Sequence, residues 1–166
     1  MTKRQVVFLL LLLTVLELYK LAQASDTSLD RSEKKYFFSD TIKLNWYKAV
    51  EFCRSRGMYL LSIRNAAERE AVVKYLESTG YPKTHDKFML WMSANDVGEE
   101  GEFHWASTGE RVNYLNWSNM EPNNFEPEEN CVVLEYWAQG GSNCNYTFND
   151  RYCTLDRLFL CETLLA

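Results

Sequence analysis

The stretch Glu121–Asp150, EPNNFEPEENCVVLEYWAQGGSNCNYTFND, decides the fold of this chain and holds most of its chemistry. It is dense in carboxylate and carboxamide oxygens, it contains no Lys, and the next Arg is Arg151. Calcium binds about 6–8 oxygen ligands and is favoured by loops that are rich in oxygen and poor in cations. The stretch therefore predicts a calcium site, with the rest of the chain acting as its scaffold.

The composition indicates a single globular domain. The chain has 166 residues, of which 46% are hydrophobic and 14% aromatic, so it can bury a core and is not of the disordered class. Its formal net charge is −5, and no strongly basic segment occurs. This balance argues against nucleic acid as a partner.

The N-terminus has the pattern of a secretory signal peptide over residues 1–24. Lys3-Arg4 precedes an apolar run from Val6 to Leu16, and Ala22-Gln23-Ala24 is a small-x-small cleavage signal. The alternative is an uncleaved membrane anchor, but the run is shorter than the roughly 17–25 residues of a spanning helix. We expect a secreted, extracellular chain without membrane contact after cleavage, with a polar leader over residues 25–35 and a folded domain over residues 36–163.

In an oxidising compartment the five cysteines, Cys53, Cys131, Cys144, Cys153 and Cys161, are expected to form disulfides. The odd count leaves one cysteine unpaired or linked to another chain, and the sequence alone leaves the connectivity open. Zinc ligation is the competing interpretation. It is disfavoured because no C-x-x-C pair occurs and the two histidines are far from the cysteines in sequence.

Periodicity predicts two early helices followed by short strands. The first helix starts after a cap at Asn45 and ends near Gly57, and the second spans Ala66–Ser78, before Gly80 and Pro82. The predicted strands lie at Tyr36–Phe38, Tyr59–Ile63, Phe88–Met92, Phe103–Trp105, Cys131–Tyr136 and Leu158–Glu162, and Gln139–Asn145 is a predicted turn. This order of elements predicts an α+β domain with a long loop.

A set of motifs occurs in a fixed order along the chain: Asn45-Trp46 with Ala49 and Cys53; Gly57, Leu60 and Ile63; Leu90-Trp91-Met92-Ser93; Asn116-Trp117; Glu121-Pro122-Asn123; Cys131; Phe148-Asn149-Asp150; Cys153; and Cys161-Glu162. Together these motifs resemble those of a known family, the C-type lectin domain, and most closely its single-domain secreted insect members. The resemblance covers Tyr36 to Glu162. It implies a C-type lectin-like fold whose antiparallel strands carry a long calcium-binding loop.

The resemblance also implies the pairing of the cysteines, with disulfides Cys53–Cys161 and Cys131–Cys153. Cys144 is then the unpaired residue, and a disulfide-linked homodimer through Cys144 is one outcome in an oxidising compartment. Two N-x-S/T sequons, at Asn116 and Asn145, would reach the glycosylation machinery in a secreted chain.

In the family, a principal calcium is held by residues that correspond here to Glu121, Asn123, Glu129, Asn149 and Asp150. Glu121, Asn123, Glu129 and Asn149 would also bind sugar, because a hydroxyl can donate to a carboxylate and accept from an amide NH₂. The Glu-Pro-Asn order resembles that of members that bind mannose-type sugars, namely mannose, glucose, N-acetylglucosamine and fucose, whereas galactose-type members carry Gln-Pro-Asp.

Two positions depart from the family pattern. Phe148 stands where the family usually has Trp, an aromatic exchange behind the ligands that we expect to be tolerated. A second calcium site of many members would here use Asp96, Glu100, Asn124, Glu129 and Asn130. Asn124 and Asn130 replace acidic residues, and fewer charged ligands weaken a calcium site, so a weak or empty site is expected.

Catalysis is not expected. The acidic pairs Glu128-Glu129 and Glu99-Glu100 are adjacent residues on polar loops, whereas glycosidase carboxyls face each other across a cleft at about 5–10 Å. The sequence therefore predicts a secreted calcium-dependent lectin of mannose-type specificity, with a role in glycan recognition in immunity or reproduction. The alternative is a domain of the same fold that binds a protein ligand, with calcium only structural or absent.

Overall fold

The computed structural model describes residue 5 and residues 14–15, 34–126, 128–139 and 145–164. The chain divides into two units, Met1–Glu33 with Leu165–Ala166 and Lys34–Leu164. Nearly all of the predicted signal peptide and leader, as well as Cys144, lie outside the described residues. Among the residues described, no helix is long and apolar enough to cross a membrane.

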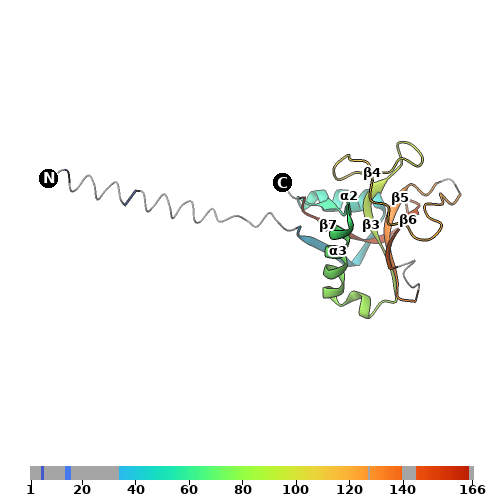
Figure 1. Ribbon diagram of the computed structural model, residues 1–166, viewed down its shortest axis with the longest axis horizontal. Coiled ribbons are helices and arrows are strands. Elements are labelled where there is room, and N and C mark those ends of the chain that lie inside the picture. The colour runs from blue at the N-terminus through green and yellow to red at the C-terminus, as the bar shows by residue number, and fades with distance from the viewer. Residues whose placement is uncertain (1–4, 6–13, 16–33, 127, 140–144, 165–166) are drawn as a thin grey trace. The chain divides into compact units, whose positions relative to one another are not determined.

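Two helices and a set of short strands make up the unit Lys34–Leu164, which confirms the predicted α+β class (Figure 1). In chain order the elements are β1 (Tyr36–Leu44), α2 (Trp46–Ser55), β2 (Tyr59–Leu60), α3 (Ala66–Thr79), the 3₁₀ helix η1 (Tyr81–Lys83), β3 (Lys87–Asn95), β4 (His104–Trp105), β5 (Cys131–Trp137), β6 (Asn145–Arg151) and β7 (Arg157–Glu162).

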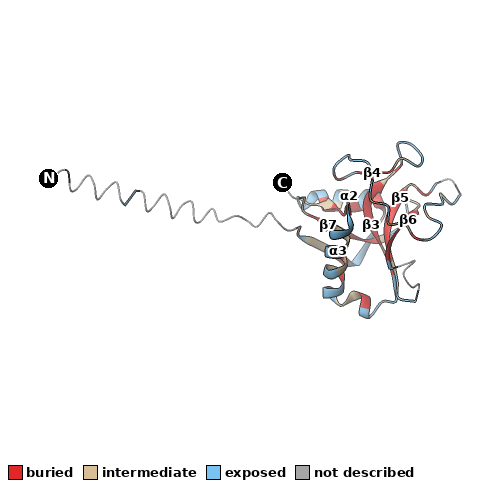
Figure 2. Cartoon of the chain, in the orientation of Figure 1, coloured by how far each residue is buried: buried red, intermediate tan, exposed pale blue. Residues whose placement is uncertain are grey.

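The strands form one sheet in the order β1-β7-β3-β5-β6, with β2 beside β7 and β4 beside β3. Because side chains alternate between the two faces of a strand, neighbouring residues enter different cores. On β3, Leu90 packs into the core that contains Val72 and Leu76 of α3, while Trp91 packs into the core that contains Ala49 of α2. In Figure 2 the central strands are mainly red, and the helices carry pale-blue, exposed residues.

The helix boundaries agree closely with the predicted ones. The Asn45 side chain accepts a hydrogen bond from the backbone N–H of Lys48 at 3.0 Å, so it caps α2 as predicted. Helix α2 ends at Ser55, two residues before Gly57. Helix α3 runs one residue beyond the predicted end, because Gly80 closes it in the left-handed conformation (φ +77°).

The strand predictions missed one strand, made two strands too short and made one too long, because β2 ends at Leu60 and not at Ile63. The sequence placed Asn145, at the start of β6, in a turn and assigned Asn149-Asp150, near its end, to the calcium-binding stretch. No strand was predicted here because Asn and Asp have low strand propensity. Strand β6 forms because Tyr146, Thr147 and Phe148 are all buried against β5 and the core. Strand β1 extends to Leu44 and β3 to Asn95, both past the predicted apolar runs.

The termini of the domain are fastened together by covalent and ionic contacts. The structure contains the disulfides Cys53–Cys161 and Cys131–Cys153, the pairs that the resemblance implies. Near the start of the domain, Lys34 Nζ lies 2.7 Å from Glu162 Oε2 and 3.2 Å from Glu68 Oε2. The Lys34 side chain is 5% exposed and Glu162 is fully buried, so this is a buried ion pair.

The tryptophans serve mainly the core. The indole N–H of Trp46 donates to the Met92 carbonyl at 2.8 Å, and that of Trp91 donates to the Leu44 carbonyl at 2.9 Å. Both side chains are buried, so neither is presented to a ligand. Trp137 at the end of β5 is 39% exposed and lies under Lys87 Nζ, 4.9 Å from the ring centroid.

Candidate functional site: the β5–β6 end and the Glu121–Asn130 loop

Strands β5 and β6 set the positions of the ligand pair Asn149-Asp150. The two strands lie side by side (Figure 1), and their antiparallel register places Val133 opposite Asn149 and Val132 opposite Asp150. Successive residues of a strand point to opposite faces, so Asn149 and Asp150 meet different parts of the loop that precedes β5. Both are nearly inaccessible, with Asn149 3% and Asp150 1% exposed.

The loop is folded onto the Asp150 carboxylate by its own backbone. The N–H of Asn123 donates to Asp150 Oδ1 at 3.2 Å, and the N–H of Asn124 donates to Asp150 Oδ2 at 2.7 Å. The N–H of Phe125 donates to Glu129 Oε2 at 3.3 Å, and the N–H of Glu129 donates to Asn124 Oδ1 at 3.2 Å. These bonds gather Asn123, Glu129 and Asp150 around one short loop, whose Glu121–Pro122 peptide bond is cis.

The Asn149 carboxamide lies between two carboxylates. Its Nδ2 donates to Glu121 Oε1 at 3.1 Å and to Glu135 Oε2 at 3.2 Å. In contrast, Asn149 Oδ1 and Glu121 Oε2 are buried and have no hydrogen-bond partner. A buried oxygen without a partner is costly. Two such oxygens, both on predicted ligands, fit the requirement of a hard cation for oxygen donors.

The raised pKa values of two carboxylates in the cluster also favour a bound cation. Burial, together with the charge of the neighbouring Asp150 carboxylate, raises the pKa of Glu121 to about 7. Burial also raises the pKa of Glu129, against the lowering effect of the Arg151 guanidinium. Carboxylates crowded in this way gain from a neighbouring positive charge.

Two residues of the cluster, Glu135 and Arg151, were missed by the sequence reasoning. Glu135 is 5% exposed and accepts from Asn149, and Arg151 Nη1 lies 3.4 Å from Glu129 Oε1. Arg151 Nη2 lies 3.9 Å from Glu135 Oε2. The signal for Glu135 was an acidic residue inside an otherwise apolar strand, since strands rarely bury a lone carboxylate.

The residues of the predicted second calcium site are held partly by hydrogen bonds. Asp96 is 3% exposed; its Oδ2 accepts from the Gly101 N–H at 2.8 Å, and its Oδ1 has no partner. Its backbone N–H donates to the Asn130 carbonyl at 3.1 Å. Burial, followed by the charges of Asp96 and Asp150, raises the pKa of Glu100. The weak or empty second calcium site stays a prediction.

Within the described ranges, no three or more His, Cys, Asp or Glu side chains are gathered into a group that could hold a metal by themselves. The donor set at the principal site therefore depends on the carboxamides of Asn123 and Asn149 as well as on carboxylates. The exposed neighbours Glu126 and Glu128 take no part in the core of the cluster, and the Glu126 carboxylate instead accepts from the hydroxyl of Tyr152 at 3.2 Å.

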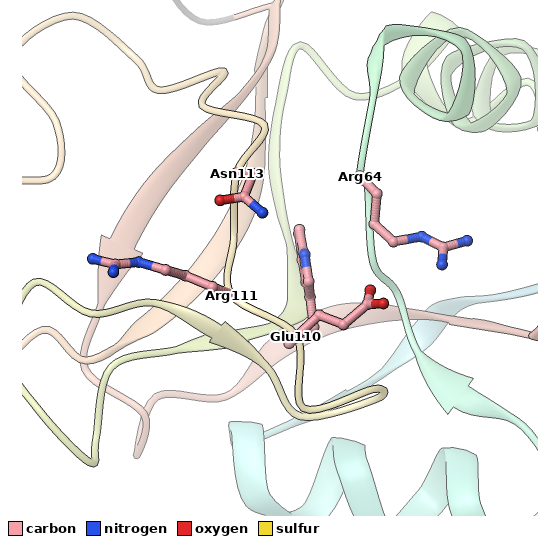
Figure 3. A pocket seen from close by; sticks show the side chains of 5 residues that line it. Arg64, Glu110, Arg111 and Asn113 are labelled. Atoms are coloured by element: carbon pink, nitrogen blue, oxygen red, sulfur yellow. The ribbon is translucent and has the colours of Figure 1, made fainter.

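A separate open pocket of about 260 Å³ lies elsewhere on the domain and is lined by Arg64, Trp105, Glu110, Arg111 and Asn113 (Figure 3). The Arg64 guanidinium is paired with Glu68 at 2.8 Å, and that of Arg111 is paired with Glu102 at 3.1 Å. In Figure 3 the two Arg side chains point away from each other. None of these residues belongs to the predicted calcium sites, and the two cations are already neutralised.

Comparison with known proteins identifies the family. The sequence model of the Lectin C-type domain matches residues 42–163. Salivary C-type lectin 2 of Aedes albopictus is 32% identical over 131 residues, covering 79% of this chain and 84% of its own length. C-type lectin 37Db of Drosophila melanogaster is 33% identical over 135 residues, 81% of each chain. The chain belongs to the C-type lectin domain family.

The fold comparison agrees with this assignment. The carbohydrate-recognition domain of the mouse scavenger receptor C-type lectin superposes with a TM-score of 0.63 at 28% identity, covering 80% of this chain and 90% of that one. Both the predicted family and the predicted C-type lectin fold are confirmed. Members of the C-type lectin domain family are non-enzymatic proteins, so the chain is not classed as an enzyme.

Proposed function

We propose that this protein is a secreted, calcium-dependent lectin for mannose-type sugars, namely mannose, glucose, N-acetylglucosamine and fucose. The observation that carries the proposal is the pair of buried oxygens without partners, Glu121 Oε2 and Asn149 Oδ1, on adjoining side chains. Calcium would be held by the carboxylates and carboxamides of Glu121, Asn123, Glu129, Asn149 and Asp150. It would supply a positive centre that attracts sugar hydroxyl oxygens.

The chain's own side chains provide the sugar selectivity. Asn149 Nδ2 and Glu121 Oε1 are 3.1 Å apart and form a donor beside an acceptor. A sugar hydroxyl has one O–H donor and acceptor lone pairs, so it can donate to the carboxylate while accepting from the carboxamide. We take the Asn123 carboxamide as the donor and the Glu129 carboxylate as the acceptor of a second pair. Two such pairs match two vicinal hydroxyls, whose relative orientation distinguishes mannose-type from galactose-type sugars.

The test of this assignment exchanges the donor and acceptor roles. Glu121→Gln with Asn123→Asp should shift retention from immobilised mannose towards immobilised galactose. The matched control is Glu126→Gln, which alters an exposed carboxylate of the same loop outside the cluster. Unchanged mannose selectivity in the double variant would contradict the assignment of the loop as the sugar site.

A protein ligand is the second candidate, and exposed apolar side chains beside the site favour it. Met120 is 84% exposed and Phe125 is 59% exposed, and they flank Glu121–Asn124 on both sides. Exposed apolar residues that gather beside a site are typical of protein interfaces. Calcium-dependent thermal stabilisation without retention on any sugar resin would support this candidate over the lectin.

The proposal also includes secretion of the protein with removal of residues 1–24. The mature chain would then consist of a leader over residues 25–35 and a domain over residues 36–163. A relative named for saliva is compatible with an extracellular role, and recognition of glycans in immunity or reproduction would be such a role.

We also propose that a disulfide through Cys144 links two copies of the chain. A non-reducing gel should then show a dimer that disappears in Cys144→Ser, whereas a monomer before and after the substitution would contradict the link.

A further inference from the structure

We propose that Glu135 is a positioning residue of the calcium and sugar site, and that it fixes the orientation of the Asn149 carboxamide. The inference rests on the proposed function and adds to it a residue outside the expected ligand set. Glu135 lies in the middle of β5 and is 5% exposed. Its carboxylate oxygen Oε2 accepts from Asn149 Nδ2 at 3.2 Å.

The geometry of strands β5 and β6 brings Glu135 and Asn149 together. Glu135 is paired with Thr147, and Val133 is paired with Asn149. Because the side-chain period of a strand is two residues, Glu135 and Asn149 project from the same face and are diagonal neighbours. Diagonal neighbours on an antiparallel pair are within reach of long side chains. The β5–β6 register therefore brings the Glu135 carboxylate to the carboxamide without help from the loop.

The Asn149 carboxamide donates to two carboxylates. An Asn NH₂ group has two N–H donors and its carbonyl oxygen is an acceptor. One N–H is directed to Glu135, from β5, and the other to Glu121, from the loop. With both N–H groups directed to carboxylates, the amide cannot flip without placing its oxygen against two negative acceptors. The carbonyl oxygen Oδ1 is thereby left free, and it is one of the buried oxygens without a partner.

The two acceptors of the Asn149 carboxamide, Glu121 and Glu135, differ in their exposure to a ligand. Glu121 is itself an expected calcium and sugar ligand, so its hydrogen bond to Asn149 is shared with whatever binds at the site. Glu135 belongs to the sheet and keeps its bond whether or not a ligand is present. Glu135 can therefore hold Asn149 Oδ1 towards the cation. The other N–H of Asn149, which faces Glu121, can then donate to a sugar hydroxyl when a ligand binds.

The Arg151 guanidinium lies near the carboxylates of both Glu135 and Glu129. It lies 3.9 Å from Glu135 Oε2 and 3.4 Å from Glu129 Oε1. It is placed on the same face of the strand pair, since Arg151 pairs with Cys131 two residues from the Val133–Asn149 pair. The positive charge offsets part of the cost of burying Glu135, which allows an acidic side chain inside an apolar strand.

The test measures calcium affinity by isothermal titration for the wild-type mature protein and for three variants. Glu135→Leu keeps the volume but removes the acceptor, and we expect calcium affinity to fall about 10–100-fold, the usual effect of losing a partner that orients a metal ligand. Glu135→Gln keeps an acceptor oxygen and loses the charge, so a loss of at most about fivefold is expected, as for a weak charge interaction.

The matched structural control is Leu134→Val, a buried truncation on the same strand that faces the α3 core. It should lower the melting temperature without changing calcium affinity. A second readout is the Asn149 side-chain NH₂ pair in a ¹⁵N correlation spectrum. In calcium-free protein these signals should move in Glu135→Leu, stay near their wild-type positions in Glu135→Gln, and remain unchanged in Leu134→Val.

The outcomes separate this inference from the proposed function. A wild-type protein that binds calcium, with Glu135→Leu binding it equally well, overturns the positioning role and leaves the lectin proposal intact. An equal loss in Glu135→Leu and Leu134→Val shows a general packing effect and also overturns the role. A wild-type protein that binds no calcium overturns both.

Discussion

Calcium binding should compete with a proton at Glu121. Burial beside Asp150 raises the pKa of Glu121 to about 7, and calcium requires the ionised carboxylate. For a single competing proton with this pKa, the apparent calcium affinity falls about tenfold between pH 8 and pH 6. This change in calcium affinity occurs at a higher pH than a glutamate with an ordinary pKa would produce, since glutamate titrates near pH 4.3 in model peptides.

Protonation of Glu121 should also affect the stability of the calcium-free protein, but in the opposite direction. The free energy of unfolding should fall as the pH rises, whereas the calcium affinity should rise. The folded-state pKa of Glu121 is raised above its unfolded value, so between about pH 4.5 and pH 7 the folded state binds more protons. The free energy of unfolding of the calcium-free protein therefore contains a contribution that is present at about pH 4.5 and is lost as the pH rises through 7. Saturating calcium should remove this dependence.

The assay is isothermal titration of calcium at pH 8, 7 and 6, with melting curves in calcium and in chelator at each pH. Glu121→Gln should bind calcium more weakly, and its affinity should be flat over this range. Glu126→Gln changes an exposed carboxylate of the same loop and should keep the wild-type slope. Equal wild-type affinities at pH 8 and pH 6 would refute the assignment of Glu121 as a buried, protonatable ligand.

Two further predictions concern the scaffold and its modification. Lys34→Met removes one partner of a buried ion pair and should destabilise the domain by about 3–5 kcal/mol in urea unfolding, whereas Lys35→Met at the exposed neighbour should stay within about 0.5 kcal/mol; equal effects would contradict the role of the pair. Asn145 is exposed, whereas the amide of half-buried Asn116 donates to the Tyr146 carbonyl at 2.9 Å. We therefore expect one N-glycan, lost in Asn145→Gln and kept in Asn116→Gln, and a glycopeptide containing Asn116 would contradict this.

The sequence predicted the helices and the family well because their signals are local. The cap at Asn45 and the left-handed position at Gly80 each depend on a single residue type and its neighbours. The central strands were found because they bury apolar runs such as Cys131–Tyr136. Signals of this kind survive without knowledge of any long-range contact.

The missed features depend on contacts between distant segments. Strand β6 contains Asn145, Asn149 and Asp150, which disfavour strands, and it becomes a strand because β5 lies beside it and buries its side chains. Glu135 acquires its role from the register that brings it to Asn149, which no local pattern contains. The two buried oxygens without partners likewise depend on how the loop folds onto Asp150.

The most direct test of the account is retention of the mature protein on immobilised mannose and, separately, on immobilised galactose, first in calcium and then in chelator. The account predicts retention on mannose that chelator releases, with little retention on galactose. Absence of retention on either resin, together with a melting temperature that calcium does not change, would contradict the calcium site and the sugar site at once.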